Sequence, residues 1–282
     1  MRILILGSSG QIGAYLTEYL RGKDHEVTEF DIARHHGEDL TQIPNHNLDR
    51  AVKNADFIFF LAFDVGGSRY LKKYQHTFEF INNNSRIMVN TFETLKKYNK
   101  PFVFASSQMS NMSFSSYGVS KSVGELYTKS LNGLVVKFWN VYGIEKDYEK
   151  SHVITDFIRK GFETGIIDMI TDGQEEREFL YADDCCEALE VVMNRYSEFT
   201  SEDNLHITSF ISTKVIDLTT IIKSLFTEID IDVRIEPSTN IDTVQHNSKN
   251  VADKYFTKWW APKTELSVGI KKVFDVMKKN YD

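Results

Sequence analysis

Short apolar runs alternate with amphipathic helical patterns over the first 140 residues, and this alternation restricts the fold more than any other feature. Five runs have the length and nearly continuous hydrophobicity of strands buried on both faces: residues 2–6, 26–31, 56–62, 101–107 and 133–139. Helical stripes lie between several of them, at residues 12–20, 88–95 and 119–127. Repeated strand–helix–strand units predict an α/β fold in which helices cover both faces of a doubly wound parallel sheet.

A glycine-rich turn follows the first predicted strand directly. The stretch GSSGQIG contains Gly7, Gly10 and Gly13, and the first helix begins within it. Glycines let the backbone turn sharply and approach a pyrophosphate, to which a helix N-terminus presents unpaired N–H groups. With Gln11 and Ile12 inside it, this turn predicts the dinucleotide loop of a Rossmann-type sheet. The alternative is an ordinary glycine turn of an α/β protein.

An acidic residue ends the second predicted strand. Asp31 follows Gly13 by 18 residues, close to the offset of roughly 20 residues at which an acid accepts hydrogen bonds from an adenosine ribose. Asp31 favours NAD over NADP, because a carboxylate would repel a 2′-phosphate. Arg34 lies three residues later and leaves NADP open as the less favoured cofactor.

The alternation is lost after Gly143, which suggests a domain boundary. We expect residues 1–147 to form the dinucleotide-binding domain and the segment 178–208 to return to it. Residues 148–177 and 209–282 should form a smaller C-terminal α/β region that binds the substrate, although residues 148–174 show no clear strand partner. Four prolines and no Ser/Gly-rich linker indicate that the two regions pack against each other.

Composition argues against several classes of partner. A net charge of −7 without clusters of Lys and Arg disfavours nucleic acid. No apolar run suits a signal peptide or a membrane span, so we expect a cytoplasmic protein with no membrane partner. Cys185 and Cys186 are neighbours and form neither a C-x-x-C pair nor a disulfide framework. His35 and His36 lie in a polar stretch without further ligands, so no metal site is predicted.

The stretch SSYGVSK carries a candidate acid/base. It places Tyr117 four residues before Lys121, on one face of a helix. Free tyrosine has a pKa of about 10, so it needs nearby positive charge to act as a base near neutral pH. The preceding predicted strand ends in Ser106 and Ser107, and ligands bind at the carboxyl ends of such strands. The alternative is a solvated helix face after two serines that only cap the strand.

These motifs together resemble the extended short-chain dehydrogenase/reductases, in the NAD-dependent nucleotide-sugar epimerase/dehydratase group. The glycine turn is similar to the G-x-x-G-x-x-G of that group, YGVSK resembles its Tyr-x-x-x-Lys, and WWAPKTELSVGI resembles its C-terminal signature. The resemblance covers most of the chain and implies a sugar-nucleotide substrate. It also implies a catalytic set of Ser107, Tyr117 and Lys121, in which Lys121, together with the positive charge of the nicotinamide, lowers the pKa of the tyrosine and holds the ribose.

Further site residues follow from the same resemblance. Asp39 and Leu40 would meet the adenine, and Trp139 the nicotinamide end. The implied cofactor-binding residues are Gly7, Gly10, Gln11, Ile12, Gly13, Asp31, Asp39, Leu40, Leu61, Ala62, Asn83 (before the next helix), Tyr117, Lys121 and Trp139. The implied substrate-binding residues are Ser107, Gln108, Asn140 and Arg177. Arg177 would contact a diphosphate; the alternative is a surface ion pair with Glu175 or Asp183.

Three departures from the family pattern bear on the reaction. Gln108 and Met109 stand where 4,6-dehydratases carry an Asp-Glu pair, which disfavours elimination of water and cysteine-assisted 3,5-epimerisation. Only ten residues separate Ser107 from Tyr117, so the sugar pocket should be more open. The segment STNIDT, residues 238–243, replaces the usual Arg-x-Gly-Asp and removes a second expected phosphate contact.

The sequence therefore favours a C4 epimerase that oxidises the sugar transiently. A one-way ketoreductase or dehydrogenase of an activated sugar is the main rival, and a catalytically silent cofactor-sensing protein is the third alternative. The helices around residues 88–95 and 119–131 carry more apolar side chains than one contact face needs. In this family the equivalent helices form a four-helix bundle, so we expect a homodimer.

Overall fold

The computed structural model describes residues 1–241 and 250–281, and its centre is a parallel sheet. The sheet has six strands in the order β2-β1-β3-β4-β5-β9. All of its pairings are parallel. The strands are β1 (Arg2–Leu6), β2 (Glu26–Phe30), β3 (Phe57–Phe60), β4 (Phe102–Ser107), β5 (Leu134–Phe138) and β9 (Leu205–Ile207). The predicted Rossmann-type fold is confirmed.

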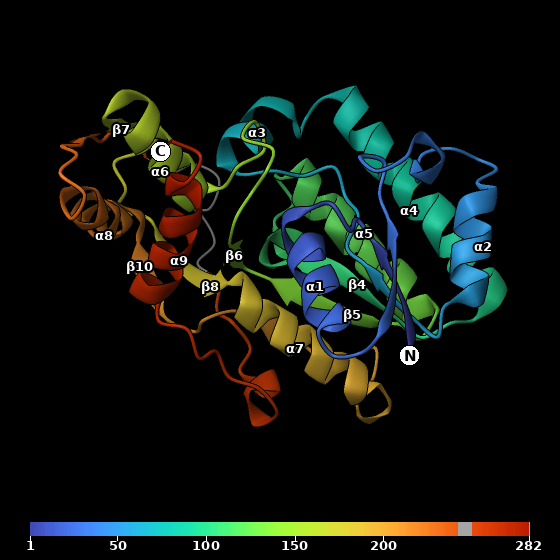
Figure 1. Ribbon diagram of the computed structural model, residues 1–282. Coiled ribbons are helices and arrows are strands. Elements are labelled where there is room, and N and C mark those ends of the chain that lie inside the picture. Colours follow the sequence, from blue (N-terminus) through green and yellow to red (C-terminus); the bar gives the residue numbers. More distant parts are fainter. Residues whose placement is uncertain (242–249, 282) are drawn as a thin grey trace.

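Helices cover both faces of this sheet (Figure 1). In β1, Ile3 and Ile5 point to a core shared with α1 (Gln11–Arg21) and α7 (Ala182–Asn194). Leu4 and Leu6 point to the opposite core, under α2 (His46–Asn54) and α4 (Phe78–Tyr98). The inner strands β1, β3 and β4 are therefore buried on both faces, which explains their apolar sequences, whereas most of the edge strand β2 is not buried.

The helix α5 (Ser116–Ser130) packs on β4 with small side chains instead of its apolar stripe. A Cβ atom at Gly124 would lie 2.3 Å from the ring of Phe104, so only glycine allows this close approach. The predicted stripe of Val119, Val123, Leu126 and Tyr127 lies on the exposed side of the helix. The helix was predicted correctly, and its apolar stripe remains available for another contact.

The second region is smaller and lies beside the first (Figure 1). It contains the sheet β10-β8-β6 and the pair β11-β7. Its elements are β6 (Asn140–Tyr142), α6 (Val153–Thr164), β7 (Ile166–Asp168), β8 (Glu176–Tyr181), β10 (Ser212–Lys214), α8 (Val215–Thr227), β11 (Arg234–Glu236) and α9 (Leu266–Lys278). Pairing of β7 with β11 corrects the expectation that residues 148–174 lack a strand partner. Three-residue strands are too short to show a periodicity in the sequence.

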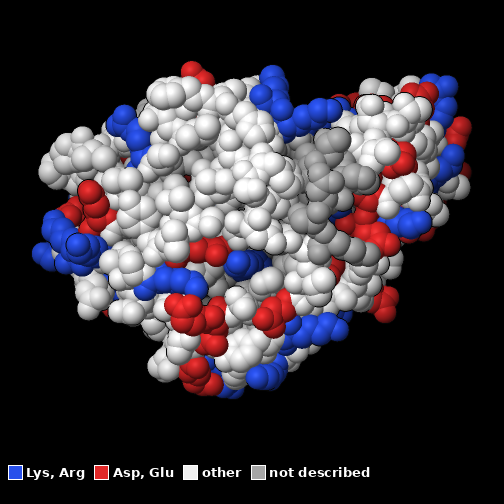
Figure 2. Space-filling view, turned by 180° about the vertical axis from the view of Figure 1, so that it is seen from behind, with Lys and Arg blue, Asp and Glu red and all other residues white. Residues whose placement is uncertain are grey.

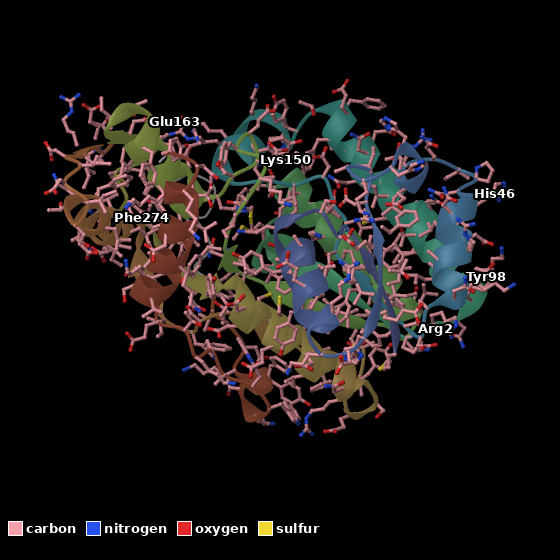
Figure 3. The ribbon with its side chains drawn as sticks, in the orientation of Figure 1. Arg2, His46, Tyr98, Lys150, Glu163 and Phe274 are labelled. Atoms are coloured by element: carbon pink, nitrogen blue, oxygen red, sulfur yellow. The ribbon has the colours of Figure 1, made fainter. Side chains whose placement is uncertain are left out.

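The two regions meet around α3 (Ser68–Tyr74), which follows the β3 strand. Asp64 accepts hydrogen bonds from Tyr70 at 2.7 Å and from the Nζ atom of Lys150 at 2.9 Å. Lys150 lies between the two lobes, whereas Phe274 lies inside the smaller one, where its ring centroid is 4.9 Å from that of Phe226 (Figure 3). Within the described ranges, no helix has the length and hydrophobicity needed to span a bilayer.

Candidate active site

The loop between β1 and α1 needs glycine at two positions, because its backbone passes very close to other backbone atoms there. Gly7 has a φ of +88°, and a Cβ atom there would lie 2.6 Å from the backbone nitrogen of Ala62. A Cβ atom at Gly13 would lie 2.1 Å from the carbonyl oxygen of Gly7. Gly10 has ordinary space around it and caps α1 without a side-chain hydrogen bond. The loop therefore presents backbone N–H groups at the start of a helix, where anions bind.

Two buried polar atoms of this loop support its fit to a dinucleotide. Neither the hydroxyl of Ser8 nor the side-chain nitrogen of Gln11 has a hydrogen-bond partner. Buried polar groups are nearly always paired, and phosphate oxygens would accept hydrogen bonds from both. The residues present thus fit the pyrophosphate of NAD, as the sequence predicted for Gly7, Gly10 and Gln11.

Carboxylates surround the end of β2. The side chain of Asp31 accepts hydrogen bonds from the backbone nitrogens of Ser9 at 3.0 Å and Ala33 at 2.9 Å. Glu38 accepts a hydrogen bond from the backbone nitrogen of Asp31 at 2.8 Å. Arg34 pairs with Glu29 at 2.7 Å and with Glu38 at 3.8 Å. Asp31 and Glu38 therefore lie near the predicted ribose position. The guanidinium of Arg34 is engaged by Glu29 and Glu38.

The predicted adenine-side residues have mainly structural contacts. Asp39 accepts hydrogen bonds from the backbone nitrogen and hydroxyl of Thr41, at 2.9 and 2.7 Å. Leu40 is buried in the core under α2 and α4. Ile12 and Leu61 are half-buried at the edge of the core under α1. Their predicted cofactor contacts stay predictions.

Asn83 does not precede a helix as expected, because α4 already begins at Phe78. The adjacent Asn84 is fully buried. Its side chain accepts a hydrogen bond from the backbone nitrogen of Asp64 at 2.8 Å and donates one to the carbonyl of the same residue at 3.0 Å. Sequence reasoning missed this residue, since nothing in the run of three asparagines distinguishes the one that faces the core. Asn84 fixes the loop that follows β3 beside Ala62.

The three predicted catalytic residues come together at the end of β4. Ser107 is the last residue of that strand, and its hydroxyl accepts a hydrogen bond from the backbone nitrogen of Met109 at 3.1 Å. The Ser107 hydroxyl lies close enough to the Tyr117 phenol to act on its pKa. Ser115 caps α5 by accepting a hydrogen bond from the nitrogen of Gly118 at 3.1 Å, and this start brings Tyr117 to the serine.

Burial dominates the ionisation of this group. It raises the pKa of Tyr117 to about 12, although the hydroxyl of Ser107 acts in the lowering direction. Burial also lowers the pKa of Lys121 to about 7, with the charge of Glu125 acting against it. Desolvation sets the direction of both shifts. The expected lowering of the tyrosine pKa involves the positive charge of the nicotinamide as well as Lys121, so it stays a prediction for the protein with NAD bound.

Lys121 is anchored to the strand that it faces. Its Nζ atom donates a hydrogen bond to the carbonyl of Ala105 at 2.6 Å. The same atom lies 3.7 Å from the ring centroid of Phe63. Only 3% of the residue is exposed. These contacts hold the amine on the β4 side of α5, one helical turn beyond Tyr117.

A cavity of about 120 Å³ lies between α3, β6, α6 and β8, and Ser107, Tyr117 and Lys121 are not among the residues that line it. Asn140 and Arg177 line it, as expected of substrate-binding residues, and so do Arg69 and Lys72. Arg69 pairs with Asp156 at 3.3 Å and with Asp168 at 3.0 Å. The cavity thus has cationic side chains from two elements, and α3 contributes two that the sequence did not indicate.

The short turn after Ser107 is covered by a later segment. Gln108 is 7% exposed. The side chain of Asn250 donates hydrogen bonds to the backbone carbonyl and to Oε1 of Gln108, at 2.6 and 2.9 Å. Asn250 therefore covers the edge of this turn. The expected effect of the short loop on the sugar pocket stays a prediction. Of the segment 238–243, residues 242 and 243 lie outside the described residues.

Trp139 lies at the end of β5, where its indole nitrogen donates to His206 at 3.3 Å. Burial, together with the charge of Lys137, lowers the pKa of His206 to about 4. The ring is therefore neutral and accepts this hydrogen bond. The predicted contact of Trp139 with the nicotinamide stays a prediction. Among residues 1–241 and 250–281, no three His, Cys, Asp or Glu side chains are arranged to hold a metal ion.

Known proteins resemble this chain in sequence and in fold. The family model described as "NAD dependent epimerase/dehydratase family" matches residues 3–207. UDP-N-acetyl-alpha-D-glucosaminuronate decarboxylase of Bacillus cytotoxicus is 27% identical over 231 residues, which cover 68% of this chain and 71% of the relative. A putative UDP-glucose 4-epimerase of Methanocaldococcus jannaschii is 30% identical over 175 residues, covering 59% of this chain and 54% of the relative. A solved epimerase structure from Methanothermobacter thermautotrophicus has a TM-score of 0.83, at 19% identity and with 99% and 93% of the two chains covered.

Proposed function

The chain belongs to the NAD dependent epimerase/dehydratase family, and from this premise we propose that it is a nucleotide-sugar epimerase, acting most simply at C4 of the sugar. The observation that carries the proposal is the contact between Ser107 and Tyr117 at the edge of the sheet, with Lys121 one turn further along α5. Gln108 and Met109, which follow Ser107, offer no acid for an elimination. This favours hydride transfer, which an epimerase performs in both directions.

Each residue of this group has a separate task. NAD bound at the glycine loop supplies a hydride acceptor that can return the hydride. Tyr117 takes the proton of the sugar hydroxyl as the carbon is oxidised, and gives it back when the keto sugar is reduced on its other face. Ser107 donates a hydrogen bond to the same sugar oxygen. Lys121 stabilises the phenolate while it is charged.

The acids at the end of β2 support NAD over NADP. A 2′-phosphate would lie near Asp31 and Glu38, and the repulsion of like charges would weaken its binding. Arg34 could offset this repulsion only by leaving Glu29, with which it pairs at 2.7 Å. We therefore expect NAD to bind more tightly than NADP, and Asp31→Ala to reduce this preference.

The cavity supports a substrate with a diphosphate. Arg177 comes from β8 and Lys72 from α3, so two cations can approach one anion from different sides. Lys72 is exposed, and no ion pair of its ammonium is found among the described residues. Lys72 would supply the second phosphate contact that the segment 238–243 lacks. Sugar nucleotides combine such a diphosphate with the hydroxyl that Tyr117 needs.

The test uses purified protein with catalytic amounts of NAD and a panel of UDP-glucose, UDP-galactose and GDP-mannose. We expect interconversion of C4 epimers, and a fall in kcat of roughly 10²–10⁴ for Tyr117→Phe. Tyr98→Phe is the matched control, because Tyr98 lies far from the site, at the outer end of α4 (Figure 3). Turnover that requires stoichiometric NADH or NADPH would favour the ketoreductase rival. Full activity of Tyr117→Phe would overturn the proposed chemistry and revive the cofactor-sensing alternative.

We also propose a homodimer formed by α4 and α5. These helices expose a set of large apolar side chains: Phe78, Ile81, Val89, Val119, Val123, Leu126 and Tyr127. The rear face of the molecule has a broad area without Lys, Arg, Asp or Glu side chains (Figure 2). Exposed apolar areas of this kind mark association sites. Two copies of the helix pair would bury them in a four-helix bundle.

A further inference from the structure

A carboxylate lies one helical turn behind Lys121. Glu125 follows Lys121 by four residues and Tyr117 by eight, so the three side chains share one face of α5. The side chain of Glu125 is only 15% exposed. Because so little of this carboxylate is exposed, water and salt screen its charge only weakly.

Both oxygens of this carboxylate are held by the sheet. The hydroxyl of Ser106 donates to Oε1 of Glu125 at 2.5 Å. The Nζ atom of Lys137 lies 3.2 Å from the other oxygen, Oε2. Ser106 and Lys137 are register partners on β4 and β5, so they approach Glu125 from adjacent strands. Ser106 also adjoins Ser107, which links this cluster directly to the group around Tyr117.

We propose that Glu125 acts on the site through Lys121: fixed by Ser106 and Lys137 one helical turn behind the amine, it favours the charged form of Lys121 beside Tyr117. The inference rests on the proposed role of Tyr117 as the acid/base. Glu125 touches neither of the reacting groups directly, and it acts through Lys121.

The physical reason is the competition between burial and charge. Burial favours the neutral amine of Lys121, and the negative charge of Glu125 favours the ammonium. The other charged or titratable groups near Glu125 are Lys137 on β5 and His206 on β9, which is the register partner of Lys137. The low pKa of His206 keeps it neutral above about pH 5. Asp253 is a second anion near His206. Glu125 is the carboxylate that pairs with Lys137 and whose charge acts on Lys121.

Glu125→Gln tests the proposal, because it keeps the shape and removes the charge. Lys121 should then lose its proton about one pH unit lower, the usual effect of removing an opposite charge in a partly buried site. The proton is followed directly by NMR of protein labelled with ¹³C at the lysine Cε atoms, with the signal of Lys121 assigned by Lys121→Met. Glu125→Asp should restore part of the shift.

Glu202→Gln is the matched control. Glu202 pairs with Lys129, which lies on α5 like Glu125, and the side chain of Glu202 is 74% exposed. This variant should leave the Lys121 titration unchanged. For any substrate of the panel that is turned over, the pH at which kcat falls on the alkaline side should be about one pH unit lower in Glu125→Gln than in wild type. A purely structural role would lower kcat at every pH without moving the pH of this fall.

An unchanged titration of Lys121 in folded Glu125→Gln would overturn the inference. If Glu125→Gln does not fold, Ser106→Ala provides the second variant, since it releases one carboxylate oxygen and should move the titration in the same direction. The two failures can be told apart. If the proposed function is wrong, Tyr117→Phe keeps its activity. The effect of Glu125 on the Lys121 titration is measured by NMR without substrate, so it is tested independently of that result.

Discussion

Replacing Lys121 by methionine should change how the stability of the protein depends on pH. Methionine keeps most of the side-chain volume and has no proton to exchange. Burial lowers the pKa of Lys121 from 10.5 to about 7 in the folded protein. Below the folded pKa the folded state carries a buried ammonium, which opposes folding. Between the folded and unfolded pKa values only the unfolded state keeps the proton, so stability rises with pH.

The two pKa values set the magnitude. Each unit of pKa difference corresponds to about 1.4 kcal/mol, so the full effect would be ~5 kcal/mol. From about pH 6 to about pH 9, titration of both states predicts that wild type gains ~3 kcal/mol of unfolding free energy relative to Lys121→Met. The variant should therefore be the more stable protein at the acidic end of this range.

Guanidinium unfolding of nucleotide-free protein at several pH values measures this difference. Lys129→Met is the control, because it removes an exposed lysine from the same helix. We expect its stability to follow that of wild type at every pH. Parallel curves for Lys121→Met and wild type would refute the reasoning, because they would show that burial does not perturb the lysine.

Three further predictions follow from the geometry. Gly13→Ala places a Cβ atom 2.1 Å from the Gly7 carbonyl oxygen, so we expect a loss of about 1–3 kcal/mol in stability and weaker NAD binding by calorimetry. An unchanged affinity for NAD would contradict the assignment of this loop. Lys72→Met should raise KM for a sugar nucleotide about 3–10-fold with little change in kcat, whereas Lys73→Met, next to it on α3, should not; equal effects would exclude a specific phosphate contact. Leu126→Asp puts a charge at a side chain that is 67% exposed, so it should weaken dimerisation at least tenfold in analytical ultracentrifugation and leave the melting temperature of the monomer nearly unchanged.

Much of the main sheet could be predicted from the sequence. Residues 3–6 of β1 and 102–105 of β4 all face a core, so their apolar runs are continuous, and in β4 two buried serines complete the strand. The Tyr117–Lys121 spacing predicted a shared helix face, which needs only the helical period. Ser107 was placed correctly because the end of a strand fixes the position of its last side chain.

Other features depend on tertiary contacts that no local pattern encodes. The helix α5 buries Gly124 and Thr128 and exposes Leu126, which reverses the usual pattern, because close packing on Phe104 needs small residues. Asn250 reaches Gln108 across a separation of 142 residues. The direction of the pKa shift of Tyr117 also depends on burial, which is known only once the chain is folded.

The helix α4 carries Asn84 on its inner side and apolar side chains on its outer side. The amide of Asn84 pairs with both backbone groups of Asp64, in the way that a neighbouring strand would. The same helix exposes Ile81 and Val89 on its outer side. A displacement of this helix would therefore move its outer apolar side chains and the loop after β3 together.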